Sequence, residues 1–432
     1  MLKLYEYQQE IVDRERDKDS HALFVGMGLG KTVMSLELMK LKPTNKLLVV
    51  CLVSKVNDWV SDAKSQSGLT LVPLRKGTKK NIELLNSDCD GFVVNFESLW
   101  RLGDSLLDMI DDTWSIIVDE SHNIKTPTSK VTRYTMRLGK RTPYKCILTG
   151  TPQSGGYVDY LTQMNFLGKW NMTRKEFEDQ YCVMVEVHWT PYKSFEIGSY
   201  KNTNKLNELL AGDCVYLERD SKYPTTHIDV EIDNSPPYRR WMKDKVFKWK
   251  ENGTEHIHIG DSSGGYRSGL RTFASGHLGL YRRESEKLTW LRDLFNSYDK
   301  RVVVFYNFNK ERDDIISLCE SLELPWSEYN GRGKDLTKFM TEDNGVAICN
   351  YKSASVGIND LVVAQVCVFY SPTDDYILFE QAKKRIDRIG QTGSPTLYYL
   401  RVKGTVEVAI YNALQKGLDF DDRLFDIYLD MC

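Results

Sequence analysis

The sequence lacks several features that would assign it to a class at once. Its nine cysteines are scattered and are never spaced as C-x-x-C, which argues against a disulfide framework or a zinc site and favours a reducing compartment. The longest apolar run, Leu47–Val53, is too short to cross a bilayer, and the N-terminus has no apolar signal-peptide core. We therefore expect an intracellular protein of the cytoplasm, the nucleoid or the nucleus, with no membrane partner.

An excess of basic charge is also missing. Lysine and arginine number 58 against 60 aspartate and glutamate, for a net charge of −2, so contacts with phosphates must come from a local cleft and not from the overall field. The seven histidines are dispersed. His256 and His258 form one H-x-H pair, but a metal there is the less favoured interpretation because a site needs more ligands than two.

The sequence does contain a repeated alternation of apolar, β-branched runs with segments of helical spacing. This alternation predicts an α/β fold in which helices cover both faces of parallel sheets. The runs fall into two sets, and 432 residues are too many for one ordinary core, so we expect two lobes. The predicted strands are Ala22–Val25, Lys46–Val53, Phe92–Phe96, Trp114–Asp119 and Cys146–Thr149 in the first lobe, and Arg301–Tyr306, Val346–Asn350, Val366–Tyr370 and Thr396–Val402 in the second.

Between the two sets the alternation fails. Pro224, the pair Pro236–Pro237 and the stretch GDSSGGYRSG interrupt it, and the basic aromatic stretch RRWMKDKVFKWK lies in the same span. We expect a connector there, with a helix over Tyr238–Lys250 followed by a flexible loop. The predicted division is residues 1–222 for the first lobe, 223–280 for the connector and 281–432 for the second lobe.

The stretch FVGMGLGKTVMSLELM places a Gly-rich turn between an apolar strand and a helix. Backbone N–H groups at such a turn, together with the helix dipole, favour a phosphate group. Gly28 and Gly30 allow the backbone to approach it closely, Lys31 would reach the terminal phosphates, and the Thr32 hydroxyl would bind Mg²⁺. The strict pattern also requires Gly where Val25 stands, so a Gly-rich turn ahead of a core helix is the alternative.

The stretch TWSIIVDESH ends a second apolar strand in two carboxylates, Asp119 and Glu120. At the end of a strand, one carboxylate can hold hydrated Mg²⁺ while its neighbour orients the attacking water. An acidic pair after a strand is also common in a helix-capping loop. The preceding phosphate loop favours the magnesium and base interpretation.

The stretch CILTGTP ends a third strand in two hydroxyls, Thr149 and Thr151. These side chains could relay the state of the γ-phosphate to a neighbouring surface. A Thr-rich turn stopped by Pro152 is an equal alternative.

The stretch DDYILFEQAKKRIDRIGQ predicts a helix with Asp374 or Asp375 as its N-cap. Gln381, Arg385 and Arg388 would then share one helix face. A charged face is usually solvated, but the apolar residues between them would pack this helix against its lobe. Two guanidinium groups suit a γ-phosphate, where one arginine can be worth about 10³–10⁵ in rate.

Taken in order, GMGLGKT, DESH, LTGTP and QAKKRIDRIGQ resemble the motifs of helicase superfamily 2, and specifically those of the Swi/Snf-type DNA translocases. The most specific motif is Q-A-x-x-R-x-x-R-I-G-Q, which Gln381–Gln391 reproduce. The stretches LYEYQQEIV, GFVVNFESLW and YKSASVGIND are similar to lesser motifs of the family. The resemblance therefore runs from about residue 2 to about residue 415.

The resemblance implies two RecA-like lobes with an ATP cleft between them. It implies ATP and Mg²⁺ as cofactors, double-stranded DNA as the partner, and hydrolysis that drives movement along DNA, usually without strand separation; a recruiting protein would be unidentified. In the first lobe, the resemblance assigns Gln8 to adenine and assigns to the rest of the nucleotide Gly28, Gly30, Lys31, Thr32, Asp119 and Glu120. Of these, the Mg²⁺ ligands would be Thr32, Asp119 and Glu120. In the second lobe it assigns to the nucleotide Gln381, Arg385 and Arg388. Lys31, Glu120, Arg385 and Arg388 would be catalytic.

The resemblance also assigns residues to contacts with DNA and to the coupling of ATP hydrolysis with movement. Each DNA-contact candidate, taken alone, is more often an ordinary loop residue. The DNA-contact candidates are Ser54, Lys55, Asn95, Ser98, Asn307, Lys352 and Ser353, and the coupling positions are Thr149, Thr151 and Gly357.

Some positions depart from the family pattern. Val25–Gly26 replace the usual acidic pair, Ala354–Ser355 the usual double glycine, and Asp374–Tyr376 the W-N-P triplet. We therefore expect a distant, compact member of the family, of the viral or bacterial kind. A strand-separating helicase of the same superfamily and an ATP-gated DNA clamp with little turnover stay open as alternatives.

Overall fold

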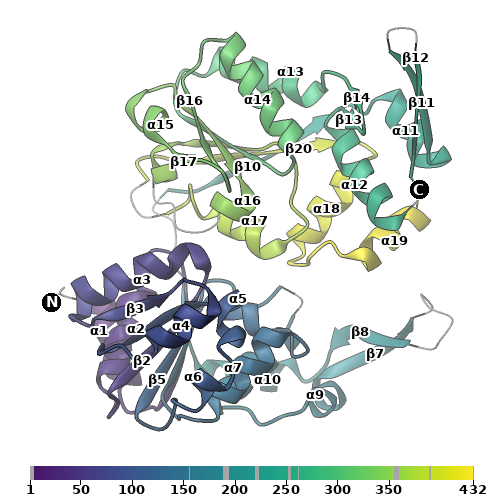
Figure 1. Ribbon diagram of the computed structural model, residues 1–432. Coiled ribbons are helices and arrows are strands. Elements are labelled where there is room, and N and C mark those ends of the chain that lie inside the picture. The colour runs from purple at the N-terminus through teal and green to yellow at the C-terminus, as the bar shows by residue number, and fades with distance from the viewer. Residues whose placement is uncertain are drawn as a thin grey trace. The chain divides into compact units, whose positions relative to one another are not determined.

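The computed structural model describes residues 4–154, 156–187, 194–218, 223–251, 254–260, 262–354, 360–388 and 391–431. The chain divides into two compact units, Met1–Asp220 and Ser221–Cys432, and each is built on one seven-stranded sheet flanked by helices (Figure 1). This confirms the α/β class with parallel sheets. The division also places residues 223–280 inside the second unit, where the sequence suggested a separate connector.

The seven strands of the first sheet are all parallel. The five strands predicted for the first lobe are present, and two short edge strands, β3 and β9, are additional. Across the sheet the order is β3 (Leu71–Leu74), β4 (Gly91–Asn95), β2 (Lys46–Cys51), β5 (Trp114–Asp119), β6 (Lys145–Thr149), β1 (Ser20–Val25) and β9 (Cys214–Leu217). The helices are α1 (Glu6–Glu15), α2 (Lys31–Lys40), α3 (Val56–Asp62), α4 (Thr78–Leu84), α5 (Phe96–Leu99), α6 (Asp104–Leu107), α7 (Lys130–Gly139), α8 (Val158–Leu167), α9 (Arg174–Tyr181) and α10 (Thr203–Asp213), and a hairpin of β7 (Cys182–Val187) and β8 (Ser194–Tyr200) follows α9.

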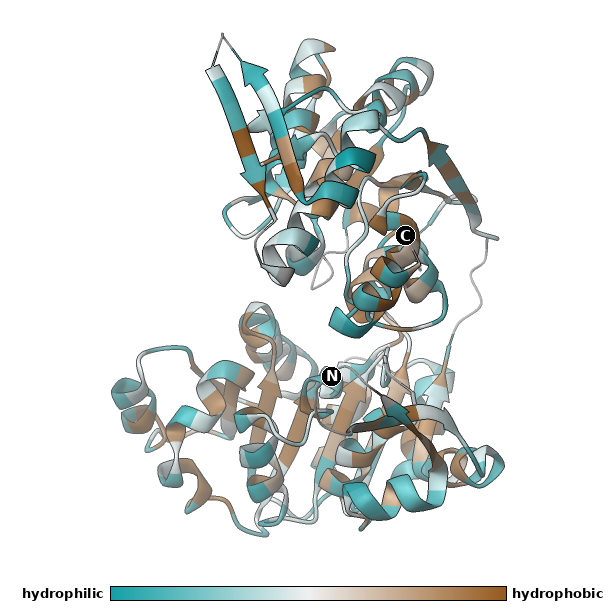
Figure 2. Cartoon of the chain, turned by 90° about the vertical axis from the view of Figure 1, so that its right-hand side faces the viewer, coloured by the Kyte–Doolittle hydropathy of each residue, from teal (hydrophilic) through white to brown (hydrophobic). Residues whose placement is uncertain are grey.

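Both faces of the first sheet are buried. Successive strand residues point to opposite faces, and in each central strand both sets lie in hydrophobic clusters. In β1, Ala22 and Phe24 belong to one hydrophobic cluster, while Leu23 and Val25 belong to another. Helices α1 to α3 contribute to the second cluster and helices α5 to α10 to the first. Figure 2 shows the resulting hydrophobic strands between helices. Burial on both sides explains why these strands read as continuous apolar runs.

The second sheet is parallel except for its edge strand β17, which runs antiparallel to β16. Its order is β10 (Thr226–Ile232), β20 (Thr396–Val402), β19 (Val366–Phe369), β15 (Val302–Tyr306), β18 (Val346–Asn350), β16 (Trp326–Tyr329) and β17 (Lys334–Asp335). The helices are α11 (Pro236–Asp244), α12 (Ser263–Ala274), α13 (Glu286–Ser297), α14 (Asn309–Ser321), α15 (Thr337–Thr341), α16 (Tyr351–Ala354), α17 (Tyr376–Lys383), α18 (Val406–Gln415) and α19 (Asp422–Asp430). Two hairpins complete the unit, β11 (Val246–Glu251) with β12 (Thr254–Ile259) and β13 (His277–Leu278) with β14 (Tyr281–Arg282).

The helix expected over Tyr238–Lys250 is wrong at both ends. Helix α11 begins at Pro236, where a proline needs no intrahelical N–H partner, and it ends at Asp244 because Lys245 adopts a left-handed conformation with φ of 54°. The residues after it alternate as a strand does, with Phe247 buried and Lys248 exposed. The aromatic side chains of RRWMKDKVFKWK thus divide between a helix and the β11–β12 hairpin.

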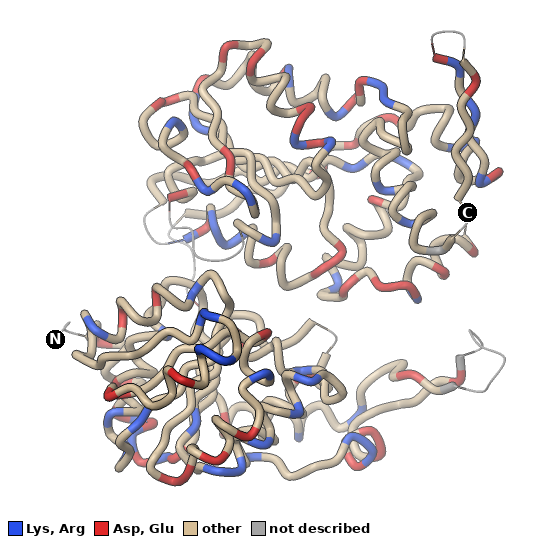
Figure 3. Tube along the Cα trace, viewed as in Figure 1, with Lys and Arg blue, Asp and Glu red and all other residues tan. Residues whose placement is uncertain are grey.

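Charges of both signs are interspersed over each unit (Figure 3). The total is also nearly balanced, at a net charge of −2. Among the described helices, none combines the length and apolar composition needed to span a bilayer. The rings of His256 and His258 pack against Trp249 and Trp241, with centroids 5.1 and 5.8 Å apart. Aromatic packing therefore accounts for the H-x-H pair.

Candidate nucleotide site

The loop between β1 and α2 adopts a conformation that requires glycine. Gly28 and Gly30 have φ of 78° and 83°, which is the left-handed region that other residues adopt only at a cost. A Cβ on Gly30 would lie only 2.1 Å from Nε2 of Gln8. The Gln8 side chain therefore packs directly against the backbone of this loop, at the residue before α2 begins.

The predicted adenine residue, Gln8, is fixed against that loop. Its Nε2 donates to the carbonyl of Leu29 over 3.2 Å, and its Oε1 accepts from the backbone N–H of Tyr5 over 3.0 Å. The Tyr7 hydroxyl donates to the same Leu29 carbonyl over 3.2 Å. Helix α1 and the phosphate-type loop are thus held together by these amide and hydroxyl contacts.

Lys31 begins α2 and its side chain lies along the loop. Its Nζ donates to the carbonyls of Val25 and Gly26 over 2.7 and 3.2 Å. A Cβ on Gly150 would lie 3.9 Å from this Nζ, so the turn after β6 lies beside the lysine. Thr32 follows in the first turn of the helix and is half-buried.

The strands β5, β6 and β1 are neighbours, and their carboxyl ends meet at one edge of the sheet. Phe24 pairs with Thr149, and Asp119 pairs with Leu148. The three sequence motifs of the first unit therefore converge. Parallel strands place functional groups at this edge in many open α/β sheets.

Asp119 is the carboxylate most perturbed by this environment. Burial raises its pKa to about 6, and the neighbouring Glu120 carboxylate acts in the same direction. A hydrogen bond of 2.9 Å from Nε1 of Trp59 and the Lys31 cation oppose the rise. A cation bound beside Asp119 and Glu120 would favour their ionised forms.

Glu120 stands in a left-handed conformation with φ of 52°, which turns its side chain toward the end of β6. Thr149 is buried, and its hydroxyl donates to Oε2 of Glu120 over 3.3 Å. Nδ1 of His122 lies 3.4 Å from the same carboxylate oxygen and 3.1 Å from the Thr149 hydroxyl. Sequence analysis did not single out His122, although it is the last residue of the DESH motif, and that position was a signal that could have identified it.

The turn after β6 is tied to the same cluster. The backbone N–H of Thr151 donates to the Thr149 hydroxyl over 3.1 Å. Further along, Nε2 of Gln163 donates to the Pro152 carbonyl over 2.8 Å, and its Oε1 accepts from Ser121 over 2.7 Å. Hydrogen bonds therefore connect Glu120 with the turn after β6, and its neighbour Ser121 with helix α8. Gly357, the third predicted coupling position, lies outside the described residues.

In the second unit, helix α17 is shorter than the sequence predicts. Asp375 is its N-cap and accepts from the backbone N–H of Leu378 over 2.9 Å, but the regular helix ends at Lys383. Arg385 and Arg388 follow in turns, so the prediction that they share one helix face with Gln381 is wrong. The cause is local, because the N–H groups of Arg385 and Ile386 bond to carbonyls three residues back, at Ala382 and Lys383, and so tighten the last turn.

These second-unit side chains are nonetheless held by packing. Gln381 and Arg385 are almost fully buried, at 5% and 3% exposure. Burial lowers the pKa of Arg388 below its ordinary value. Of the four apolar positions predicted to pack this segment against its lobe, Ile377, Ala382 and Ile386 are buried, and Ile389 lies outside the described residues.

The DNA-contact candidates of the first unit lie at the ends of two adjacent strands. Ser54 and Lys55 follow β2, while Asn95 ends the neighbouring strand β4 and Ser98 follows it. Ser54 is exposed, and Nζ of Lys55 pairs with Asp58 over 2.8 Å. Asn95 donates to Glu97 over 2.6 Å and is buried.

The candidates of the second unit show the same placement. Asn307 follows β15, and Lys352 and Ser353 lie in α16 after the neighbouring strand β18. Nδ2 of Asn307 donates to the Pro372 carbonyl over 3.1 Å. The two strand ends therefore bring these residues to one edge of the second sheet.

A buried carboxylate that sequence analysis missed organises this edge. Glu311 is fully buried and accepts from the Ser275 and Ser371 hydroxyls over 2.6 and 2.7 Å. Its other contacts are the backbone N–H groups of Asn307 and Phe308, each at 3.0 Å. The backbone partners are local, at the start of α14, but Ser275 and Ser371 come from two distant segments, which no local pattern reveals.

The chain resembles known proteins along most of its length. Residues 7–221 match the family described as the SNF2-related domain. The SWI/SNF-related matrix-associated actin-dependent regulator of chromatin subfamily A-like protein 1 of Xenopus tropicalis is 23% identical, over 91% of this chain and 42% of that protein. DNA excision repair protein ERCC-6 of Homo sapiens is 22% identical, over 95% of this chain and 31% of that protein.

The chain therefore spans less than half the length of these two relatives. Among solved structures, the Sulfolobus solfataricus SWI2/SNF2 ATPase core in complex with dsDNA aligns over 98% of this chain and 93% of its own, at 18% identity and a TM-score of 0.46.

Proposed function

This chain carries a SNF2-related domain and belongs to the Swi/Snf family, and on that premise we propose that it is a DNA-dependent ATPase that moves along double-stranded DNA without separating the strands. The observation that carries the proposal is the convergence of Lys31, Asp119 and Glu120 at one edge of the first sheet. A relative named as a DNA excision repair protein supports DNA as the substrate.

The residues at this edge fit a magnesium nucleotide. Two left-handed glycines shape the loop whose backbone N–H groups would bind phosphate oxygens, and Lys31 supplies a cation at the start of α2. Thr32 and Asp119 are the oxygen ligands that would hold Mg²⁺, which neutralises charge on the phosphates when it is bound. Gln8, which packs against Gly30, is the proposed contact of the adenine.

Within this site Glu120 is the proposed base. Its carboxylate would accept the proton of the attacking water while the Thr149 and His122 contacts hold its orientation. Arg385 and Arg388 are the proposed contacts of the γ-phosphate from the second unit, with Gln381 beside them. Thr149 and Thr151 are the proposed coupling residues between this site and helix α8. The Thr151 N–H bonds to the Thr149 hydroxyl, and the carbonyl of the next residue, Pro152, accepts from Gln163 of α8.

The proposed contacts with the DNA backbone are the strand-end residues of both sheets. Hydroxyl, amide and ammonium groups recognise phosphates without reading sequence, and Ser54, Lys55 and Lys352 offer such groups. The remaining proposed contacts are Asn95, Ser98, Asn307 and Ser353. A recruiting protein would select where on the DNA the ATPase works.

The decisive test is ATP hydrolysis measured with duplex DNA, single-stranded DNA and RNA. We expect slow basal turnover, strong stimulation by duplex DNA, and stimulation that declines steeply with salt. Glu120→Gln should lower the stimulated rate by about 10²–10⁴, whereas Glu83→Gln, an exposed control on α4, should not. Stimulation by RNA alone would remove DNA as the substrate.

Two further assays separate the alternatives. A translocase displaces the third strand of a triplex and leaves a forked duplex intact, whereas a strand-separating helicase opens the fork. An ATP-gated clamp would release almost no phosphate at saturating duplex DNA. Opening of the forked duplex, or almost no phosphate release at saturating duplex DNA, would overturn the proposed movement on intact duplex.

A further inference from the structure

A pocket of the first unit lies between α7, α8 and the start of α9, and none of its lining residues belongs to the nucleotide site. Its volume is about 470 Å³, which is enough for one or two large side chains of a ligand. Met136, Leu161 and Met172 form its apolar part. Leu161 is buried, and both methionines are half-buried. Methionine side chains adapt to ligands of varied shape.

The polar part of the pocket carries charge of one sign only. Arg133, Arg137, Lys140 and Arg174 line it, and no carboxylate does. Arg137 pairs with Asp104 over 3.1 Å, and Arg174 pairs with Glu178. For Arg133 and Lys140 the described part of the chain provides no ion pair, and both are exposed. Two cations beside an apolar hollow are therefore left for a ligand.

The backbone on one side of the pocket is held in place before any ligand binds. Nδ2 of Asn165 donates to the Met172 carbonyl over 2.7 Å, and the Met172 N–H donates back to Oδ1 of Asn165 over 3.3 Å. The next residue, Thr173, caps α9 and accepts from the Glu176 N–H over 3.2 Å. The segment that carries Met172 is thus tied to α8 and α9, which lowers the entropy lost on binding.

We propose that this pocket binds an acidic, amphipathic segment of a partner protein. An apolar side chain of that segment would enter between Met136, Leu161 and Met172, and its carboxylates would meet Arg133 and Lys140. Helices with apolar residues on one face bind grooves of this kind. Nucleic acid is disfavoured, because the sugar-phosphate backbone of a duplex has no protruding apolar side group that would fill the hollow.

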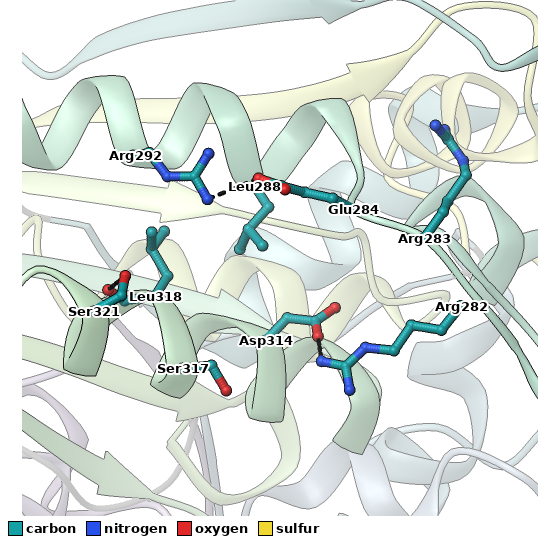
Figure 4. A pocket seen from close by; sticks show the side chains of 9 residues that line it. All are labelled: Arg282, Arg283, Glu284, Leu288, Arg292, Asp314, Ser317, Leu318 and Ser321. Atoms are coloured by element: carbon teal, nitrogen blue, oxygen red, sulfur yellow. Dashed lines mark hydrogen bonds and ion pairs between the residues drawn. The ribbon is translucent and has the colours of Figure 1, made fainter.

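A pocket of the second unit provides the contrast. Its volume is about 320 Å³ and it is lined by three arginines, but each has a carboxylate partner. Arg282 reaches Asp314 and Arg292 reaches Glu284 (Figure 4), while Arg283 pairs with Glu286 over 2.7 Å. Since its charges are already matched, this pocket does not select an acidic ligand.

The test uses the full chain and a fluorescein-labelled peptide of twelve residues, built from Glu, Asp and Leu with the leucines at helical spacing. Fluorescence anisotropy should show saturable binding that weakens at least tenfold with Arg133→Glu/Lys140→Glu. A peptide with serine in place of leucine should bind at least tenfold more weakly to the natural chain. Arg239→Glu/Lys243→Glu, which reverses two exposed charges on α11, should leave the affinity unchanged.

Several outcomes would overturn the proposal. Equal peptide affinity for the natural chain and for Arg133→Glu/Lys140→Glu, with unchanged thermal unfolding of the variant, would exclude the two cations. Equal binding of the serine peptide would exclude the apolar hollow. If the double variant loses duplex DNA affinity but keeps peptide affinity, the ligand is DNA. If sedimentation shows a dimer that the double variant abolishes, the occupant is a second copy of this chain.

Discussion

Gly30 is subject to two separate constraints at the residue scale. Its φ of 83° is disfavoured for any residue with a Cβ, and a Cβ would meet the Gln8 amide at 2.1 Å. The first constraint concerns the stability of the loop. The second concerns the placement of the residue proposed to hold adenine.

Gly30→Ala should therefore lower both stability and nucleotide affinity. We expect the free energy of unfolding to fall by about 1–2 kcal/mol, the cost of the left-handed conformation, and ATP binding to weaken because Gln8 must move. Chemical denaturation and fluorescent nucleotide titration measure the two effects. Gly212→Ala is the matched control, because Gly212 lies in helix α10 with open space around its Cβ position, and it should be neutral or slightly stabilising.

The raised pKa of Asp119 predicts a pH dependence of stability. At a pH between the ordinary value of 3.8 and about 6, the folded chain holds a proton on this carboxyl that the unfolded chain releases. Stability should therefore fall as the pH rises through about 6, where the folded state must ionise a buried group. Asp119→Asn removes that ionisation and keeps an oxygen for the Trp59 N–H.

Thermal unfolding at pH 5 and pH 7.5, without nucleotide or magnesium, measures this effect. The stability of Asp119→Asn relative to the natural chain should increase between the two pH values. A constant difference would show that Asp119 titrates as an exposed carboxyl does.

At the scale of elements, strands were easier to predict than helix ends. The central strands are buried on both faces, so their apolar runs mark them clearly. The end of α17 depends on the tighter backbone bonds that Arg385 and Ile386 make, and the end of α11 depends on the left-handed Lys245. Neither is visible in the periodicity of side chains.

Helices α13 and α18 are joined by a buried ion pair, which makes a prediction at this scale. Lys287 and Glu407 are 0% and 1% exposed, and Lys287 also donates to the Ser275 hydroxyl over 3.0 Å. Burial raises the pKa of Glu407 although Lys287 opposes the rise. Lys287→Met would leave Glu407 buried without its cation and should cost about 3–5 kcal/mol of stability.

The double variant Lys287→Met/Glu407→Gln should recover part of that loss, because no buried charge remains. Lys403→Met, which breaks an exposed pair with Glu231, should leave the denaturation midpoint near its natural value. A small effect of Lys287→Met alone would mean that water reaches Glu407.

On the scale of the whole molecule, the hydrophobic clusters respect the division into two units. Two clusters lie within the first unit, and one large cluster lies within the second. Each unit therefore has the core that independent folding requires. The proposed catalytic residues come from both units, since Lys31 and Glu120 belong to the first and Arg385 and Arg388 to the second.

Fragments 1–220 and 221–432, expressed separately, should each fold. We expect a cooperative thermal transition in the circular dichroism of each fragment, and no DNA-stimulated ATP hydrolysis by either one. A fragment without a cooperative transition would contradict the independence of its core. Stimulated hydrolysis by fragment 1–220 alone would remove Arg385 and Arg388 from the proposed chemistry.

The sequence by itself determined the features that rest on local order along the chain. Apolar runs specified the central strands, and the glycine spacing before Lys31 specified the loop. The acidic pair at the end of β5 specified two members of the site. These features depend on neighbours within a few residues, which the sequence displays directly.

Only the tertiary structure decided what depends on distant residues meeting. Gln8 lies against Gly30, His122 and Thr149 hold Glu120, and Glu311 gathers hydroxyl and backbone groups from separate segments. Strand β10 joins the second sheet because β20, more than 160 residues later, supplies its hydrogen bonds, beginning with Thr226 opposite Thr396. Such contacts are set by the order of strands in the sheets, and local sequence pattern does not encode that order.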